Sequence, residues 1–172
     1  MEELLRRLLE VQAGLVDGSL IRGAIVPYSR DIYDLQIEQL FEGKASSGQD
    51  IRPYYSEDLQ SAGGYFRTPD SAKRYADWKQ TIGRNASRNP DAPNLYINGK
   101  FHNEIDVADL GDSIAILPKT PYAEQIMQKY GLDTFGLTES NWNIIFANGA
   151  SENLVNYIRA MLWIMHQLYP MR

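Results

Sequence analysis

The sequence predicts an α+β fold, in which helices pack on a small antiparallel β-sheet and a long helix closes the chain. Apolar residues recur at helical spacing in several segments, whereas Ser113–Leu117 alternates as a strand does. The chain has 172 residues, of which 44% are hydrophobic and 23% charged, a composition typical of a packed globular domain. We expect one domain, 1–172, with an N-terminal helical pair at 2–42, a central α+β segment at 94–146 and a C-terminal helix at 151–169.

Leucines at helical spacing predict a first helix over Glu2–Val16, with breaks at Gly18 and Gly23. Pro27 suits the first turn of a second helix, where its missing N–H is harmless. Gly43 is a natural end for that helix.

Thr68 as N-cap and Pro69 in the first turn predict a helix that runs to Ile82. Further on, Thr120 opens a helix to Tyr130, and Thr138 can cap a helix through Phe146. These starts each combine a capping side chain with a following periodic segment.

The dipeptide Asn98-Gly99 is a strong hairpin signal between Leu95–Ile97 and Phe101–Val107. The flanking segments do not alternate cleanly, so a turn into a short helix is the alternative. Ser113–Leu117 provides a further strand in either case.

Ser151 can cap the last helix, which carries a broad apolar surface. Its stripe consists of Leu154, Val155, Ile158, Leu162, Met165 and Tyr169, widened by Met161, Trp163 and Ile164. A helix that is apolar over this much of its surface is either deeply buried or docked on another chain.

Charge and motifs exclude several classes of function. The net charge of −5 argues against nucleic-acid binding as the main task. The chain has no cysteine, no apolar run of the ~18 to 20 residues that span a bilayer, and no secretory signal at its start. Its two histidines, His102 and His166, stand in no metal-binding pattern.

No G-x-S-x-G sequence and no phosphate-binding glycine loop is present. Carboxylate pairs such as Glu57-Asp58 or Glu104-Asp106 could serve glycoside cleavage, although solvated surface is the favoured interpretation. We expect no enzyme activity, no catalytic residue, no cofactor and no metal.

Basic and aromatic residues interleave between positions 65 and 88, where Asp70 and Asp77 dilute the positive charge. Such a zone can contact nucleic acid, but Arg, Tyr and Trp are also the residues enriched in protein interfaces. We favour a protein interface. The candidate interface residues are Tyr54, Tyr55, Tyr65, Phe66, Arg67 and Trp78, with Met161, Trp163 and Ile164 from the last helix.

Short motifs recur in a particular order along the chain. They are D-L-Q-I-E-Q-L, F-E-G-K-A-S-S-G-Q-D-I-R-P-Y-Y-S, N-L-Y-I-N-G-K-F-H-N-E-I, A-E-Q-I-M-Q-K-Y-G and D-T-F-G-L-T. This order resembles small proteins of tailed bacteriophages and prophages of Bacteroidetes, including crAss-like phages. It is also similar to the tail-completion or virion-morphogenesis family, which joins head to tail. The resemblance spans Asp31 to Phe146; Asn98 stands where threonine is usual, and the C-terminal helix has no counterpart.

The resemblance implies a structural virion protein of the neck or tail, assembled in the host cytoplasm as a ring of six or twelve copies. Its partners would be itself and the portal or neighbouring neck and tail proteins, with genomic DNA at most passing through a channel and no membrane contact. Two alternatives stay open. One is a virion-associated cell-wall hydrolase, since eleven tyrosines and three tryptophans could line a sugar groove. The other is a small regulatory protein that binds one partner.

Overall fold

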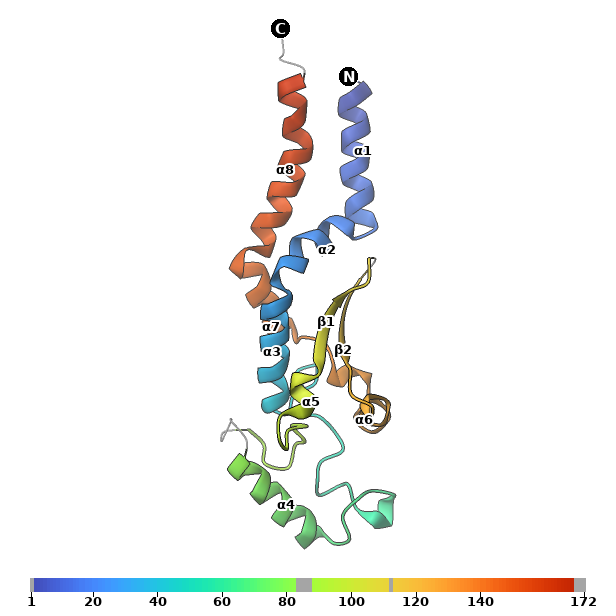
Figure 1. Cartoon of the computed structure of the whole chain (residues 1–172), viewed down its shortest axis with the longest axis vertical. Coiled ribbons are helices and arrows are strands. Elements are labelled where there is room, and N and C mark those ends of the chain that lie inside the picture. The colour runs from blue at the N-terminus through green and yellow to red at the C-terminus, as the bar shows by residue number, and fades with distance from the viewer. Residues whose placement is uncertain (1, 83–87, 112, 169–172) are drawn as a thin grey trace.

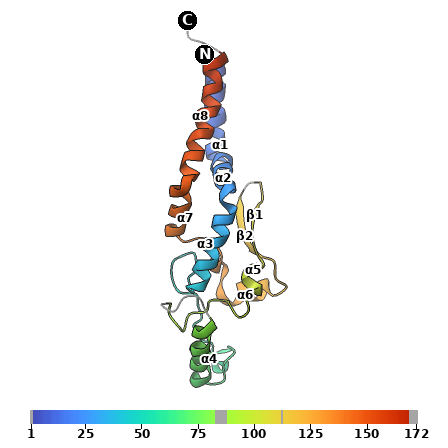
Figure 2. The same ribbon diagram turned by 60° about the vertical axis from the view of Figure 1, so that its left-hand side comes forward.

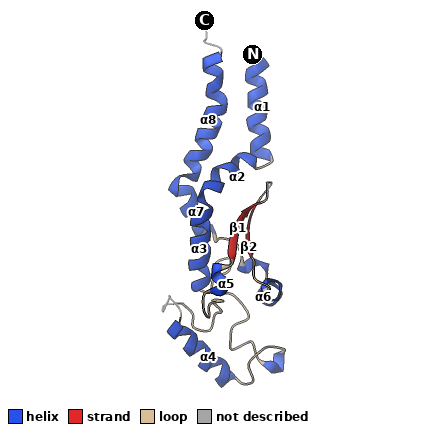
Figure 3. Cartoon of the chain, in the orientation of Figure 1, coloured by secondary structure: helices blue, strands red, loops and turns tan. Residues whose placement is uncertain are grey.

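The computed structural model describes residues 2–82, 88–111 and 113–168, and the side chains of 5–82, 88–111 and 113–162. The molecule is elongated, with α1 and α8 forming a stalk at one end and α4 lying at the other (Figure 1). The elements are α1 (Glu2–Val16), α2 (Ser19–Ile25), α3 (Ser29–Phe41), α4 (Pro69–Ile82), α5 (Lys100–Asn103), β1 (Ile105–Asp109), β2 (Ile114–Pro118), α6 (Ala123–Tyr130), α7 (Glu139–Ile145) and α8 (Ser151–Leu168). Helices dominate and the two strands form one small sheet (Figure 3), which confirms the predicted α+β class.

Both predicted helices of the N-terminal segment are present as α1 and α3, but the expected pair missed α2, a third helix between them. Gly18 adopts a left-handed conformation, with φ of 77°, and ends α1. The chain restarts at once as α2, and Gly23 lies inside this helix rather than breaking it. Pro27 lies in a short 3₁₀ turn, Val26–Tyr28, immediately before α3.

The sheet is a hairpin of β1 and β2, paired antiparallel from Ile105 opposite Pro118 to Asp109 opposite Ile114. The expected hairpin at Asn98-Gly99 is wrong, and the alternative of a turn into a short helix is confirmed. Gly99 takes a φ of 82° at the start of α5. The Asn98 side chain accepts a hydrogen bond from the backbone N–H of Lys100 at 3.1 Å, which closes this turn locally.

Helix α3 runs through the core, where Ile32 and Leu40 are fully buried. Two buried glutamines on α3 fasten the segment that leads into α7. Gln36 accepts a hydrogen bond from the backbone N–H of Gly136 at 2.8 Å. Gln39 donates to the carbonyl of Gly136 at 2.8 Å and accepts from the N–H of Thr138 at 2.9 Å. Because these polar groups satisfy one another, the start of α7 is fixed against α3.

Thr138 caps α7 as predicted, accepting a hydrogen bond from the N–H of Asn141 at 3.3 Å. The chain then bends at Gly149, whose φ is 123°, and α8 runs back beside α2 and α1. Two views of the ribbon agree on this arrangement (Figures 1 and 2). The predicted C-terminal helix is confirmed from Ser151 to Leu168, and position 169 lies outside the described residues.

Candidate interaction surfaces and a cationic pocket

The stalk exposes an apolar stripe along α1. Of residues 5–16, only Val11 and Gly14 are buried. Five apolar side chains are exposed, up to 82% in the case of Val16, and they are Leu5, Leu8, Leu9, Leu15 and Val16. Leu8 and Leu15 are seven residues apart, as are Leu9 and Val16. This is the spacing of side chains that meet across packed helices.

Helix α8 contributes a second incompletely covered surface. None of its described side chains, 151–162, is fully buried. Val155 and Tyr157 are exposed, and Met161 is half-buried. Within the described chain, α8 is therefore not the deeply buried helix that was one of the two predicted possibilities. Docking of α8 on another chain stays a prediction.

The exposed surface of the whole chain is large for its mass. It amounts to 10789 Å², whereas a compact monomer of 19.6 kDa is expected to expose about 8,600 Å². The difference, about 2,200 Å², is larger than the surface that each partner buries in a standard protein interface, about 800 Å². An extended stalk of two helices contributes to such an excess, because neither helix buries all of its sides.

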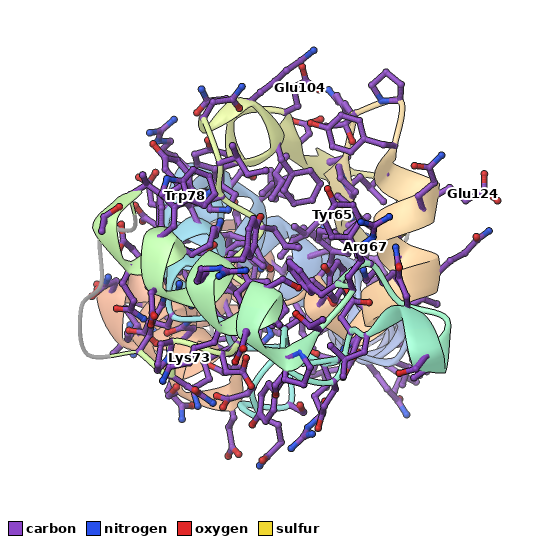
Figure 4. The ribbon with its side chains drawn as sticks, turned by 90° about the horizontal axis from the view of Figure 1, so that it is seen from below. Tyr65, Arg67, Lys73, Trp78, Glu104 and Glu124 are labelled. Carbon is purple, nitrogen blue, oxygen red and sulfur yellow. The ribbon has the colours of Figure 1, made fainter. Side chains whose placement is uncertain are left out.

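The opposite end presents part of the predicted aromatic interface. Tyr65 is 72% exposed, Trp78 is 44% exposed and Arg67 is exposed. Figure 4 views this end: α4 crosses the face, and Tyr65 and Arg67 lie away from Trp78, towards the adjoining loop. These three side chains are available to a partner at the end of the molecule.

Two residues of the predicted interface are internal instead. Tyr55 and Phe66 are buried together with Ala72 and Ala76 of α4. Their rings are packed edge to face with centroids 6.1 Å apart, so they hold the loop onto α4 rather than forming a surface. This corrects their placement in the interface.

Tyr54 is half-buried and locally engaged. Its ring lies under the guanidinium of Arg52 at 3.9 Å, and its hydroxyl donates to the Asp50 carboxylate at 2.9 Å. The side chains of Trp163 and Ile164 lie outside the described residues. The interface role of all these residues stays a prediction.

A cavity of about 370 Å³ lies between α4 and the central segment. Five aromatic side chains line it together with Lys79, and they are Tyr55, Tyr75, Phe101, Tyr122 and Tyr130. They come from the 54–66 loop, α4, α5 and the α6 region. The cavity is therefore formed by segments that are distant in sequence, with the buried cationic side chain of Lys79 among aromatic walls.

Lys79 is 1% exposed, which is unusual because lysine is almost never fully buried unless it is paired. Across the described residues, no carboxylate forms an ion pair with it. Burial, and secondarily the charge of Arg88, lowers the pKa of Lys79 from its ordinary 10.5 to about 8. The amine is still largely protonated at neutral pH.

Arg88 is a second buried cation, 6% exposed. Its Nη1 donates to the carbonyl of Ala92 at 2.6 Å, whereas Nε and Nη2 are buried without a hydrogen-bond partner among the described residues. Burial lowers the pKa of Arg88 as well. Sequence reasoning counted Lys79 and Arg88 among the basic residues of the candidate interface zone between positions 65 and 88, and it did not predict their burial.

No group of three or more histidine, aspartate or glutamate side chains in the described part of the chain is placed to hold a metal ion. None of the helices within the described ranges combines the length and the apolarity needed to cross a lipid bilayer.

A scan of protein-family models, a search of curated proteins and a search of solved structures each found no match to this chain.

Proposed function

We propose that this protein is a structural subunit of a tailed-phage neck or tail, which assembles with copies of itself into a ring through its two-helix stalk. The observation that carries the assembly is the apolar stripe of α1, whose described side chains Leu5, Leu8, Leu9, Leu15 and Val16 are exposed. The phage setting comes from the resemblance of the motif order between Asp31 and Phe146.

The stripe has the pattern of a helix that packs against further helices. Leu5, Leu8 and Leu15, with Gln12 between them, follow alternating three- and four-residue steps. A single polar residue in such a seam specifies register and the number of helices that associate, at some cost in stability. Copies of the same helix supply matching seams, which favours self-association over binding of an unrelated partner.

Covering the stripe contributes favourably to assembly. Full burial of a leucine side chain stabilises by about 1.5 to 3 kcal/mol, and each copy brings several half-exposed or more exposed apolar groups on α1. Even partial burial of these groups offsets a substantial share of the cost of association, about 4 to 15 kcal/mol.

A ring also requires that two different faces of each subunit meet. The end of the molecule that carries Tyr65, Arg67 and Trp78 lies far from the stalk (Figure 1) and supplies a distinct face. In a ring, that face would contact the next copy, and in a particle it could also contact the portal or a neighbouring neck or tail protein.

Light scattering coupled to size-exclusion chromatography tests the assembly. We expect the purified chain to elute as a closed oligomer, and the double variant Leu8→Gln/Leu15→Gln to elute as a folded monomer. Leu132→Gln is the matched control, because Leu132 is also exposed but lies outside the stalk. A monomeric wild-type chain, or an oligomer that persists in the double variant, would mean that the stalk does not mediate the assembly.

Peptide mass spectrometry on density-purified phage particles from the source, before and after tail removal, tests the setting. Recovery at a fixed ratio to the portal subunit supports a neck or tail position. Absence from the particles, with abundant protein in infected cells, would refute the virion role and favour a regulatory one.

A further inference from the structure

We infer that the cavity between α4 and the central segment binds a small organic anion with an aromatic or aliphatic body, whose negative charge is taken by Lys79. This site is independent of the stalk and of the proposed assembly. The inference starts from Lys79, a buried lysine for which the described residues provide no counter-ion.

The carboxylates of the neighbouring loop segments are engaged elsewhere. Asp58 accepts a hydrogen bond from Lys129 Nζ at 2.6 Å. Asp91 accepts from the backbone N–H of Ser56 at 3.0 Å and from the hydroxyl of the same serine. Neither forms an ion pair with Lys79, so the described chain does not neutralise this amine.

Arg88 adds to the uncompensated positive charge. Its charge disfavours protonation of Lys79, and two of its own nitrogens are buried without partners among the described residues. Burying one cation without a counter-ion is costly, and burying two near each other costs more. An anion in the cavity would stabilise the charge of Lys79 by direct contact and the charge of Arg88 by longer-range electrostatic attraction.

The walls define the rest of the ligand. Tyr55 and Tyr75 lie on one side, and Phe101 and Tyr130 come from the central segment. Aromatic faces and edges favour a flat or aliphatic body. The volume of about 370 Å³ falls within the range of small-molecule sites, about 300 to 1,000 Å³. A free inorganic ion would leave most of this apolar surface uncovered.

The mouth offers secondary polar contacts. Asn98 and Lys100 line the cavity and are exposed. They can contact a second polar group of the ligand without requiring its burial. The expected ligand is therefore amphipathic, with its anionic group inside at Lys79 and any further polar group at the mouth.

Fluorescence titration with 1-anilinonaphthalene-8-sulfonate tests the site, because this probe joins an aromatic body to one negative charge. N-phenyl-1-naphthylamine, which lacks the sulfonate, is the matched neutral probe. We expect the wild-type chain to bind the sulfonate at least about tenfold more tightly than Lys79→Met does, a difference of about 1.4 kcal/mol. We expect the neutral probe to bind both proteins equally.

Lys73→Met is the control variant, since Lys73 lies on the same helix but is exposed. It removes one charge from α4 and is expected to bind the sulfonate as the wild-type chain does. Lys79→Arg keeps the charge and is expected to retain binding. Probe that binds to the leucines of the stalk contributes equally in all variants and does not alter the comparison.

The pH dependence on the wild-type chain provides a test that needs no variant. Affinity for the sulfonate is expected to fall by up to about tenfold per pH unit above pH 8, as Lys79 loses its proton. Among the other titratable groups at the cavity, Lys100 lies at the mouth. Burial raises the pKa of Tyr55, Tyr75 and Tyr130, so these hydroxyls stay neutral over this range.

Equal sulfonate affinity in the wild-type chain and Lys79→Met would overturn the inference. So would equal binding of the charged and neutral probes, or sulfonate affinity that is constant from pH 7 to 9. Each of these results would mean that Lys79 does not receive the anion.

Discussion

Replacing Lys79 by methionine is expected to stabilise the folded chain in the absence of a ligand. Methionine retains the length of the side chain and removes a charge that is 1% exposed. The difference between an ordinary lysine pKa of 10.5 and about 8 in the folded chain corresponds to about 3 kcal/mol, at roughly 1.4 kcal/mol per pH unit. That figure is the cost of keeping the amine charged in the fold at neutral pH.

The cost has a defined pH window. Because the folded pKa of Lys79 lies below the unfolded one, the unfolded chain binds more protons at this group between pH 8 and 10.5. The stability of the wild-type chain therefore rises across this window relative to the variant. The advantage of Lys79→Met is complete below pH 8 and disappears above pH 10.5.

Urea denaturation of both proteins from pH 7 to 10.5 measures this difference directly, and subtraction cancels the tyrosines that titrate in the same range. Thermal unfolding at pH 7 provides a second readout. For a chain of this size, about 3 kcal/mol corresponds to a rise in Tm of about 6 to 12 °C. Lys73→Met, on the exposed side of the same helix, is expected to change Tm by less than about 2 °C.

A variant that is no more stable than the wild-type chain at pH 7, with a difference that does not change up to pH 10, would refute the reasoning. Lys79 would then be hydrated or paired in solution, and the uncompensated charge on which the anion site depends would not exist.

Three further predictions concern groups that the fold buries or pairs. Gln39→Leu leaves the N–H of Thr138 and the carbonyl of Gly136 without their side-chain partner, so urea denaturation should show a loss of about 2 to 4 kcal/mol. The Asp50 carboxylate accepts hydrogen bonds chiefly from Lys44 and also from Asn89, and these bonds lower the pKa of Asp50 to about 2. Its contribution is present above pH 4 and is lost as the pH falls towards 2, so Asp50→Asn should flatten the acid unfolding curve in that window. Burial raises the pKa of Tyr130 above its ordinary 10. Above pH 10 the unfolded chain loses the Tyr130 proton more readily than the folded chain does, so the folded state loses stability as the pH rises. Tyr130→Phe removes this effect and should shift the alkaline unfolding midpoint upwards.

The helix positions were predictable because their signals are local. Thr68 caps α4, since its hydroxyl oxygen accepts a hydrogen bond from the backbone N–H of Ser71 at 3.2 Å, and Thr138 caps α7 in the same way. A capping side chain acts within its own turn, so sequence alone reveals it. The two glycine bends at Gly18 and Gly149 are local for the same reason.

The hairpin was misplaced because strand pairing is not a local property. Asn98-Gly99 does form a tight turn, as its residues predict. The element after this turn is helix α5, because Phe101 is buried there against Phe41 and Ile51. A dipeptide indicates where the chain turns, but the distant residues that cover the next side chain decide which element comes after the turn.

The surface and the pocket were the hardest to predict. Tyr55 and Phe66 have the composition of an interface, but the loop that carries them folds back onto α4 and buries both. Lys79 did leave a signal, because it lies seven residues after Ala72 and three after Ala76, both buried. A lysine on the apolar side of a helix is an exception that the periodicity alone can reveal.

The stalk and α4, which carries Lys79, lie at opposite ends of the subunit (Figure 1). Substitutions in distant regions without shared partners usually have additive effects on stability. In the monomeric Leu8→Gln/Leu15→Gln background, Lys79→Met should therefore give the same stabilisation as in a single folded chain. In an assembled ring with two different contact faces, the α4 end of one copy can lie near the next copy. A non-additive effect of Lys79→Met that appears only in the oligomer would mean that position 79 is energetically coupled to a contact between copies.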